Sequence, residues 1–449
     1  MTAKKEKKRI LNRLKTMYPL RAKVDESYHN SVAAMEAGKP TAWAMLNWWQ
    51  GDVILKAMDV EIVYPENYGA VCAAQGIAQE YLERSDRDGF PTHLCGYSRN
   101  AFGYVSRMIQ DFNGNIPPEA PMGGMPKPVL LMGSNVICDA RYKWFQALGH
   151  YMDVPLWVLE MPTPGVKELF MDDVREHCIE FIVQGLREFV SFMERLLGKK
   201  MDWDKLDEIV TLTIQIHRVW HEANELRKAV PCPVHSRDFW SAMTAALFLM
   251  GDLNDTLTCY EALYDEVKHR VDNGISAINA DEKYRLMFSE LPPWHTLKIF
   301  DDLAERGWNF VIETWGYHPP IPIDLSPYGD PLERLARHCF QFNTGYFAEA
   351  LQEGETFGYH AYPHFAYARD WKTDGAFLHP LITCRSASSH LPTVRDMLRK
   401  KLNIPTIMVE GDIVDLRLFD PASVLNQAEA FEEIMEHYRE ERREKGFDW

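Results

Sequence analysis

Three of the eight cysteines share a sequence context that could support chemistry at one site. Cys95 lies in LCGYSRN after a proline-containing break, Cys138 in SNVICDARYKW after an apolar segment, and Cys384 in ITCRSASSHLP after another. Each lies at or near a predicted turn from a strand into a helix. Ligands of open α/β sheets collect at the carboxyl ends of the strands, and helix N-termini favour thiolates, so the three thiols could meet there.

Three thiolates at one place could hold three irons of a [4Fe–4S] cluster and leave the fourth iron open to water, substrate or a partner's ligand. The alternative is ordinary packing, because a buried cysteine behaves as a small hydrophobe. The chain has no C-x-x-C pair, so the spacing of the cysteines leaves both interpretations open.

A second set of side chains could bind zinc. It consists of two histidines of a predicted helix and two residues of the loop after that helix: His217, His221, Cys232 and His235. His360 and His364 in YHAYPHF form a similar pair. Neither set contains H-E-x-x-H, and paired histidines are common on solvated helix faces. We therefore favour a structural role for both sets.

Several common catalytic motifs are missing from the sequence. There is no G-x-x-x-x-G-K-[ST] loop for ATP, no glycine fingerprint for a dinucleotide, and no G-x-S-x-G serine elbow. ATP hydrolysis, NAD binding of the usual kind and serine hydrolysis are therefore not expected of this chain.

The composition and net charge of the chain indicate a large folded core and argue against a nucleic-acid-binding protein. The 449 residues are 46% hydrophobic, which allows a large core and two or three domains, and the formal net charge is −16. This charge argues against a nucleic-acid partner. The only basic run is KKEKKR at 4–9, and Ile10, Leu11, Leu14 and Met17 follow it at helical spacing, which predicts the first turns of an amphipathic helix.

The chain shows no membrane segment and no secretion signal. No 18 apolar residues run together without a charge, and the N-terminal residues lack an apolar stretch followed by a cleavage site. We expect a cytoplasmic protein that does not enter a membrane and whose thiols are reduced.

Apolar runs and helical periodicities alternate along the chain and predict where these side chains are placed. Strands are expected at 128–135, 154–162, 308–315, 374–383 and 404–412, and helices at 141–152, 166–198, 206–230, 291–307 and 394–403. Continuous apolar strands separated by helices are typical of parallel sheets. The fold class expected is α/β, with two open, mostly parallel sheets flanked by helices, as in Rossmann-like or flavodoxin-like halves.

The same pattern predicts four regions. Residues 1–40 form an N-terminal helical segment, 41–165 a first α/β domain with Cys95 and Cys138, 166–285 a helical connecting region, and 286–449 a second α/β domain with Cys384.

Five blocks of the sequence resemble the 2-hydroxyacyl-coenzyme A dehydratase and benzoyl-coenzyme A reductase family. They are PENYGAVCAA (65–74), LCGYSR (94–99), SNVICDARYKWFQAL (134–148), CRSASSHLPTVRDML (384–398) and IPTIMVEGDIVDLRLF (404–419). The block at 280–307 resembles the benzoyl-coenzyme A reductase branch in particular. The resemblance covers nearly the whole chain.

This resemblance implies that Cys95, Cys138 and Cys384 bind a [4Fe–4S] cluster, whereas Cys72, Cys178, Cys259 and Cys339 are packing residues. It implies a homologous cluster-bearing partner subunit, an acyl-coenzyme A substrate, and a separate ATP-hydrolysing activator or subunit pair that delivers electrons from reduced ferredoxin. We expect an oxidoreductase subunit that takes part in reducing the ring of benzoyl-coenzyme A to a cyclohexadienoyl product, in anaerobic aromatic degradation. The alternatives are a subunit of a 2-hydroxyacyl-coenzyme A dehydratase, which works through a ketyl radical, and a cluster-free scaffold. Catalytic residues other than the cluster ligands are not assigned.

The need for a separate electron donor agrees with the missing ATP motif. Iron–sulfur potentials reach about −700 mV, and about 59 mV uphill lowers a one-electron equilibrium tenfold. Polar residues beside the thiols could tune such a potential, although turn and cap roles are the alternative. These residues are Ser98, Arg99, Ser134, Asn135, Arg385, Ser386 and Ser388.

Overall fold

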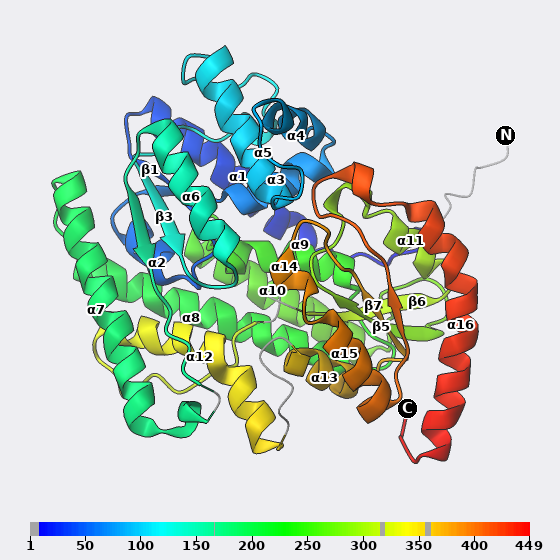
Figure 1. Ribbon diagram of the computed structural model, residues 1–449. Coiled ribbons are helices and arrows are strands. Elements are labelled where there is room, and N and C mark those ends of the chain that lie inside the picture. Colours follow the sequence, from blue (N-terminus) through cyan, green and yellow to red (C-terminus); the bar gives the residue numbers. More distant parts are fainter. Residues whose placement is uncertain (1–8, 166, 315–318, 355–360) are drawn as a thin grey trace, which may run out of the picture.

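The computed structural model describes residues 9–449 apart from residue 166, residues 315–318 and 355–360, and the side chain of Phe347. Its strands form two parallel four-stranded sheets, which confirms the expected α/β class (Figure 1). The first sheet has the order β2 (Glu61–Val63), β1 (Thr41–Ala44), β3 (Leu130–Ser134), β4 (Leu156–Leu159). The second has the order β6 (Trp308–Glu313), β5 (Tyr284–Ser289), β7 (Gly375–Leu378), β8 (Thr406–Met408).

Helices surround both sheets. They are α1 (Met17–Glu36), α2 (Gln50–Ala57), α3 (Pro65–Ala74), α4 (Ala78–Arg87), α5 (Gly96–Ser106), α6 (Asp139–Met152), α7 (Asp172–Leu197), α8 (Trp203–Glu225), α9 (Ser236–Leu247), α10 (Leu253–Asp272), α11 (Ile299–Ala304), α12 (Pro331–Gln352), α13 (Ala361–Asp370), α14 (Arg385–Ser388), α15 (Leu391–Met397) and α16 (Pro421–Glu444). In Figure 1 the two sheets lie on opposite sides of the molecule, with α9 and α14 between them. In the described part of the chain, none of these helices is long and apolar enough to cross a membrane.

The two sheets have the same topology. In each, the first strand in the chain is flanked by the second on one side and the third on the other. The order in which strands are added to the sheet therefore reverses between β1 and β3, and between β5 and β7, although all strands are parallel. Helices cover both faces, and every residue of β1, β3, β5, β6 and β7 is buried. In a sequence, strands buried on both faces appear as continuous apolar runs, so β3 and β6 could be predicted. The crevice at a reversal, outside the carboxyl ends of the strands, is where open α/β folds bind ligands.

Two sequence expectations were wrong in detail. The segment 291–307 was expected to be one helix, but it contains a 3₁₀ turn at Trp294–Thr296 followed by the short α11. The amphipathic helix expected from Ile10 onward begins only at Met17, because Leu11 pairs in an antiparallel bridge with Ile278. The basic run at 4–9 lies largely outside the described residues. The four-region division of the chain stays a prediction.

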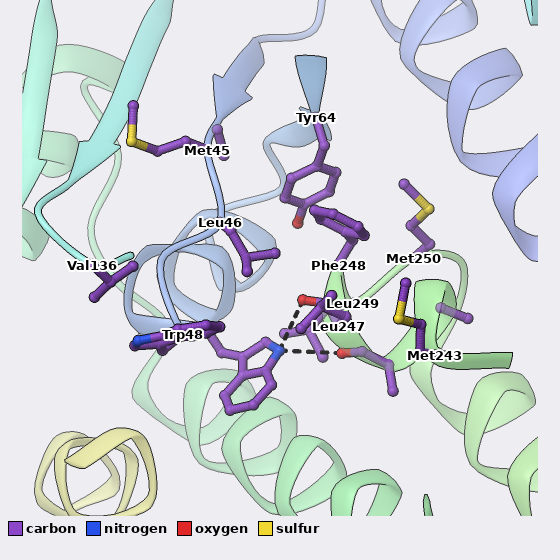
Figure 2. Packing of buried hydrophobic residues seen from close by; sticks show 14 of the residues in the cluster. Met45, Leu46, Trp48, Tyr64, Val136, Met243, Leu247, Phe248, Leu249 and Met250 are labelled. Atoms are coloured by element: carbon purple, nitrogen blue, oxygen red, sulfur yellow. Dashed lines mark hydrogen bonds between the residues drawn. The ribbon is translucent and has the colours of Figure 1, made fainter. Parts of the chain in front are cut away.

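The loop after β1 is held against α9 in the middle of the molecule. Trp49 donates from its indole Nε1 to the carbonyl oxygens of Ala246 at 3.2 Å and Leu247 at 3.0 Å, bonds that are dashed in Figure 2. The same figure shows Leu46 and Tyr64 facing Phe248, with the rings of Tyr64 and Phe248 4.8 Å apart. This packing places α9 against the carboxyl edge of the first sheet.

Candidate functional site

The three cysteines lie at the starts of helices. Cys138 and Cys384 follow the strands β3 and β7, but Cys95 follows helix α4, so the expected turn from a strand into a helix was wrong for Cys95. Cys95 is the N-cap of α5, Cys138 of α6 and Cys384 of α14. All three are partly buried, and all three line one cavity of about 260 Å³ between the two halves. The structure therefore brings the three predicted residues to a single site.

Hydrogen bonds between the two halves hold the cysteine loops together. Ser386, two residues after Cys384, donates from Oγ to the carbonyl oxygen of Ile137 at 2.9 Å. Thr383, immediately before Cys384, accepts at Oγ1 from the backbone N–H of Gly96 at 3.2 Å and donates to the buried Asp412. The Ser386 bond joins a neighbour of Cys384 to a neighbour of Cys138, and the Gly96 bond joins another to a neighbour of Cys95. The bond to Asp412 lies within the second half and holds Thr383 in place.

Burial raises the pKa of each thiol. The pKa of Cys384 rises to about 12, and that of Cys95 is raised well above its usual value by burial and, to a smaller extent, by repulsion from Cys384 and Cys138. At Cys138 burial also dominates, although the nearby Arg141 opposes it. A free catalytic thiolate needs a lowered pKa, so this set does not suit a nucleophile. Thiolates crowded in a buried site need bound cations to stabilise them, which fits metal ligands.

The polar neighbours of the cysteines make hydrogen bonds to oxygen atoms elsewhere. Ser98 donates to the carbonyl of Cys95 at 2.8 Å, and Ser134 donates to that of Leu46 at 2.9 Å. The remaining partners are Met161 for Asn135, Asp86 and Asp415 for Arg99, Asp139 for Arg385, Ile137 for Ser386 and Leu381 for Ser388. These side chains fix the turns around the thiols.

A charged pair that the sequence analysis missed also lines the cavity. Arg141, in the first turn of α6, donates to Glu66 Oε2 at 2.6 Å and to the carbonyl of Leu46 at 2.7 Å. Glu66 Oε2 also accepts from the backbone N–H of Leu46 at 2.8 Å. A guanidinium near a helix N-terminus is unfavourable unless an anion faces it. The position of Arg141, three residues after Cys138 at the start of a predicted helix, is therefore the sequence feature that could have indicated a nearby anion.

The rest of the cavity wall is largely apolar and comes from both halves. Trp240 and Phe248 contribute from the α9 region, and Leu291 contributes from the loop after β5. Trp294 donates from Nε1 to the hydroxyl of Tyr97 at 2.7 Å and so closes one side. An apolar pocket with a few fixed polar groups is typical of sites for small organic ligands.

The first histidine and cysteine set makes structural hydrogen bonds, in line with the role favoured from the sequence. His217 Nδ1 lies 2.7 Å from Nε2 of His338, a residue outside the set. The thiol of Cys232 donates to a backbone carbonyl, and His235 caps α9 by accepting from the N–H of Arg237. Among the described residues, the one group of three His, Cys, Asp or Glu side chains with ligand atoms within 4.8 Å of one another is Glu290, His364 and His390. His360, of the second set, lies outside the described residues.

The fold and the site define a class of protein with two matching α/β halves and a cavity that collects thiols from both. The chain belongs to the family described as 2-hydroxyglutaryl-CoA dehydratase, D-component, whose model matches residues 52–435. This family was the one that the sequence blocks indicated, and its relatives are enzyme subunits that act on coenzyme A thioesters.

Three relatives illustrate the range of the similarity. The chain is 25% identical over 446 residues to the (R)-2-hydroxyisocaproyl-CoA dehydratase alpha subunit of Clostridioides difficile, covering 97% of this chain and 98% of that protein. It is 24% identical over 406 residues to the (R)-phenyllactyl-CoA dehydratase alpha subunit of Clostridium sporogenes, covering 90% and 92%. It is 24% identical over 380 residues to a subunit of the benzoyl-CoA reductase of Thauera aromatica, covering 79% of each chain. The dehydratase and reductase subunits match at similar identity, but the dehydratase subunits match over a larger share of the chain.

Proposed function

We propose that this chain is the [4Fe–4S]-carrying subunit of an enzyme that removes water from a 2-hydroxyacyl-coenzyme A, with Cys95, Cys138 and Cys384 as the cluster ligands. The observation that carries the proposal is the meeting of these three thiols from both halves at one largely apolar cavity. Matches along more than 90% of the chain to dehydratase alpha subunits favour dehydration.

The residues of this chain have distinct tasks in the proposed site. When bound, the cluster would supply one-electron chemistry at low potential and an open iron. The apolar wall that includes Trp240 and Trp294 excludes water from the cavity and packs against the acyl group. Arg141 holds Glu66 at the cavity, where the carboxylate can orient a polar group of the substrate.

The proposal includes partners. The chain has no ATP-binding loop, so an ATP-hydrolysing protein must raise the energy of the incoming electron, with reduced ferredoxin as its source. A homologous cluster-bearing subunit would complete the assembly, and the relatives are themselves named as subunits.

Reduction of benzoyl-coenzyme A is the second candidate function. It is favoured by the match to a benzoyl-CoA reductase subunit and by the sequence block at 280–307, which contains β5, Leu291 and Trp294. Leu291 and Trp294 line the cavity, so this block forms part of the proposed substrate wall.

One experiment tests the cluster and separates the two reactions. The chain is purified anaerobically with its partner subunit, and about four irons per chain are expected. Cys138→Ala should remove this iron, whereas Cys178→Ala, a buried cysteine of α7, should not. With ATP and a strong reductant, loss of water from a hydroxyacyl thioester supports dehydration, and consumption of benzoyl-coenzyme A supports reduction. An iron-free complex would contradict both and leave the scaffold role.

A further inference from the structure

A second group of ligand-type side chains lies at the carboxyl edge of the second sheet. Glu290 directly follows β5, His364 comes from α13, and His390 lies between α14 and α15. Glu290 and the imidazole of His364 are buried, and the side chain of His390 is only 11% exposed. Three separate segments of the chain therefore converge on one enclosed place.

The distances within this group are short. Glu290 Oε1 lies 2.8 Å from His390 Nε2 and 3.6 Å from His364 Nε2. The hydroxyl oxygens of Ser289 and Thr314 each lie 2.8 Å from the same His364 Nε2. Five nitrogen and oxygen donors thus surround a small volume.

Hydrogen bonding alone accounts poorly for this arrangement. A ring nitrogen of a neutral imidazole carries either one proton or one lone pair, so His364 Nε2 cannot serve both hydroxyl oxygens well. Glu290 Oε2 is buried and has no hydrogen-bond partner among the described residues. A buried carboxylate oxygen without a partner is costly. A cation bound between the two imidazole nitrogens and the carboxylate would accept lone pairs from all three side chains.

The backbone at Glu290 is also unusual. Its φ is +79°, in the left-handed region that is strained for a non-glycine residue. Such conformations persist where the surroundings hold them and gather at functional sites. Glu290 follows β5, beside the point between β5 and β7 where the strand order reverses, and α/β folds place their ligands at such points.

We propose that Glu290, His364 and His390 bind one divalent first-row transition metal ion, with Zn²⁺ the expected occupant. Two imidazole nitrogens and one carboxylate oxygen form a ligand set that Zn²⁺ uses in proteins, and a hydroxyl of Ser289 or Thr314 can fill the fourth position. The site is distinct from the three cysteines and does not depend on the function proposed for them. Its enclosure suits a structural ion, which ties the loop that carries Leu291 to the segment that follows Cys384.

Metal analysis of the full chain with its partner subunit tests the site. The complex is purified anaerobically with a tag that lacks histidine, equilibrated with Zn²⁺ and freed of unbound metal, and about one zinc per chain is expected. Glu290→Gln and His364→Gln should each lose this zinc. His437→Gln, at an exposed histidine of α16, should retain it. Chelation should lower the Tm of the wild type and of His437→Gln, but not that of Glu290→Gln.

X-ray absorption at the zinc edge separates this site from zinc bound at the cysteines. Nitrogen and oxygen ligands at about 2.0–2.2 Å are expected, whereas cysteine sulfur would appear at about 2.3 Å. This measurement needs only the wild type, so it stands even if a variant fails to fold. A wild-type complex without zinc, zinc bound by sulfur, or equal zinc in both site variants and the wild type would overturn the proposal.

Discussion

Ser386 donates a hydrogen bond from Oγ to the carbonyl oxygen of Ile137 at 2.9 Å, which joins the loop of Cys384 to the loop of Cys138. Ile137 is β-branched yet has a φ of +72°, a strained conformation that its surroundings must hold. The bond fixes the strained turn before Cys138 to the start of α14. The spacing of the thiols in the proposed cluster site thus depends on contacts between the two halves.

Removing this bond should loosen the proposed cluster site. Ser386→Ala is expected to lower the free energy of unfolding by about 1 kcal/mol, the net contribution of one hydrogen bond. It should also speed the loss of iron to a chelator under anaerobic conditions. Ser389→Ala is the matched control, because Ser389 donates to the carbonyl of Arg385 within the same segment. Equal rates of iron loss in the two variants would contradict the role of the Ser386–Ile137 hydrogen bond in holding the two loops together.

Glu66 should matter for both stability and activity. Glu66→Gln keeps the shape of the side chain but leaves the guanidinium of Arg141, only 4% exposed, without its counter-charge. Breaking a buried pair on one side costs about 3 kcal/mol. Urea unfolding measures this cost, and steady-state assays of the complex should show at least a tenfold lower kcat. Glu83→Gln, at an exposed glutamate of α4, is the control; a comparable loss there would argue against a local role.

Asp52 should make stability depend on pH. Burial raises its pKa from 3.8 to about 7, although the hydrogen bond from Asn47 opposes the increase. The folded state therefore keeps a proton that the unfolded state releases, and this contribution is full below about pH 4 and lost as the pH rises to 7. At higher pH the cost is on the order of 4 kcal/mol.

Asp52→Asn removes this titration. The substitution should raise the free energy of unfolding more at pH 8 than at pH 5.5, by about 2 kcal/mol. Denaturant unfolding at the two pH values checks the difference. The same gain at both would show that Asp52 is charged in the folded protein.

Two glycines in helices should respond in opposite directions to alanine. A Cβ on Gly103 would lie 1.8 Å from the backbone carbonyl oxygen of Tyr81, so Gly103→Ala must push α5, the helix that Cys95 caps, away from α4. This overpacking should cost about 3 kcal/mol. At Gly185 in α7 no atom lies within 4 Å of the added carbon. Gly185→Ala should therefore stabilise by about 0.5–1 kcal/mol in thermal unfolding.

Much of the fold could be predicted because its strands are buried on both faces. The runs that became β3, β4 and β6 are apolar, and the helices between strands have clear periodicity. The central strand β5 was missed because it begins with Tyr284 and Arg285 after a charged segment. Arg285 is nevertheless buried, because it pairs with Glu282 at 2.8 Å and donates to the carbonyl of Trp371.

The sequence by itself determined which thiols lie at the starts of helices, and so which three residues could share a site. Only the tertiary structure decided what surrounds them. The pairing of Arg141 with Glu66, and the meeting of Glu290 with His364 and His390, join segments far apart in the chain. Such contacts depend on the order of strands in each sheet and on how the two sheets face each other. The local periodicity of the sequence predicts neither the strand order nor the way the sheets face each other, because it indicates only which face of an element is buried.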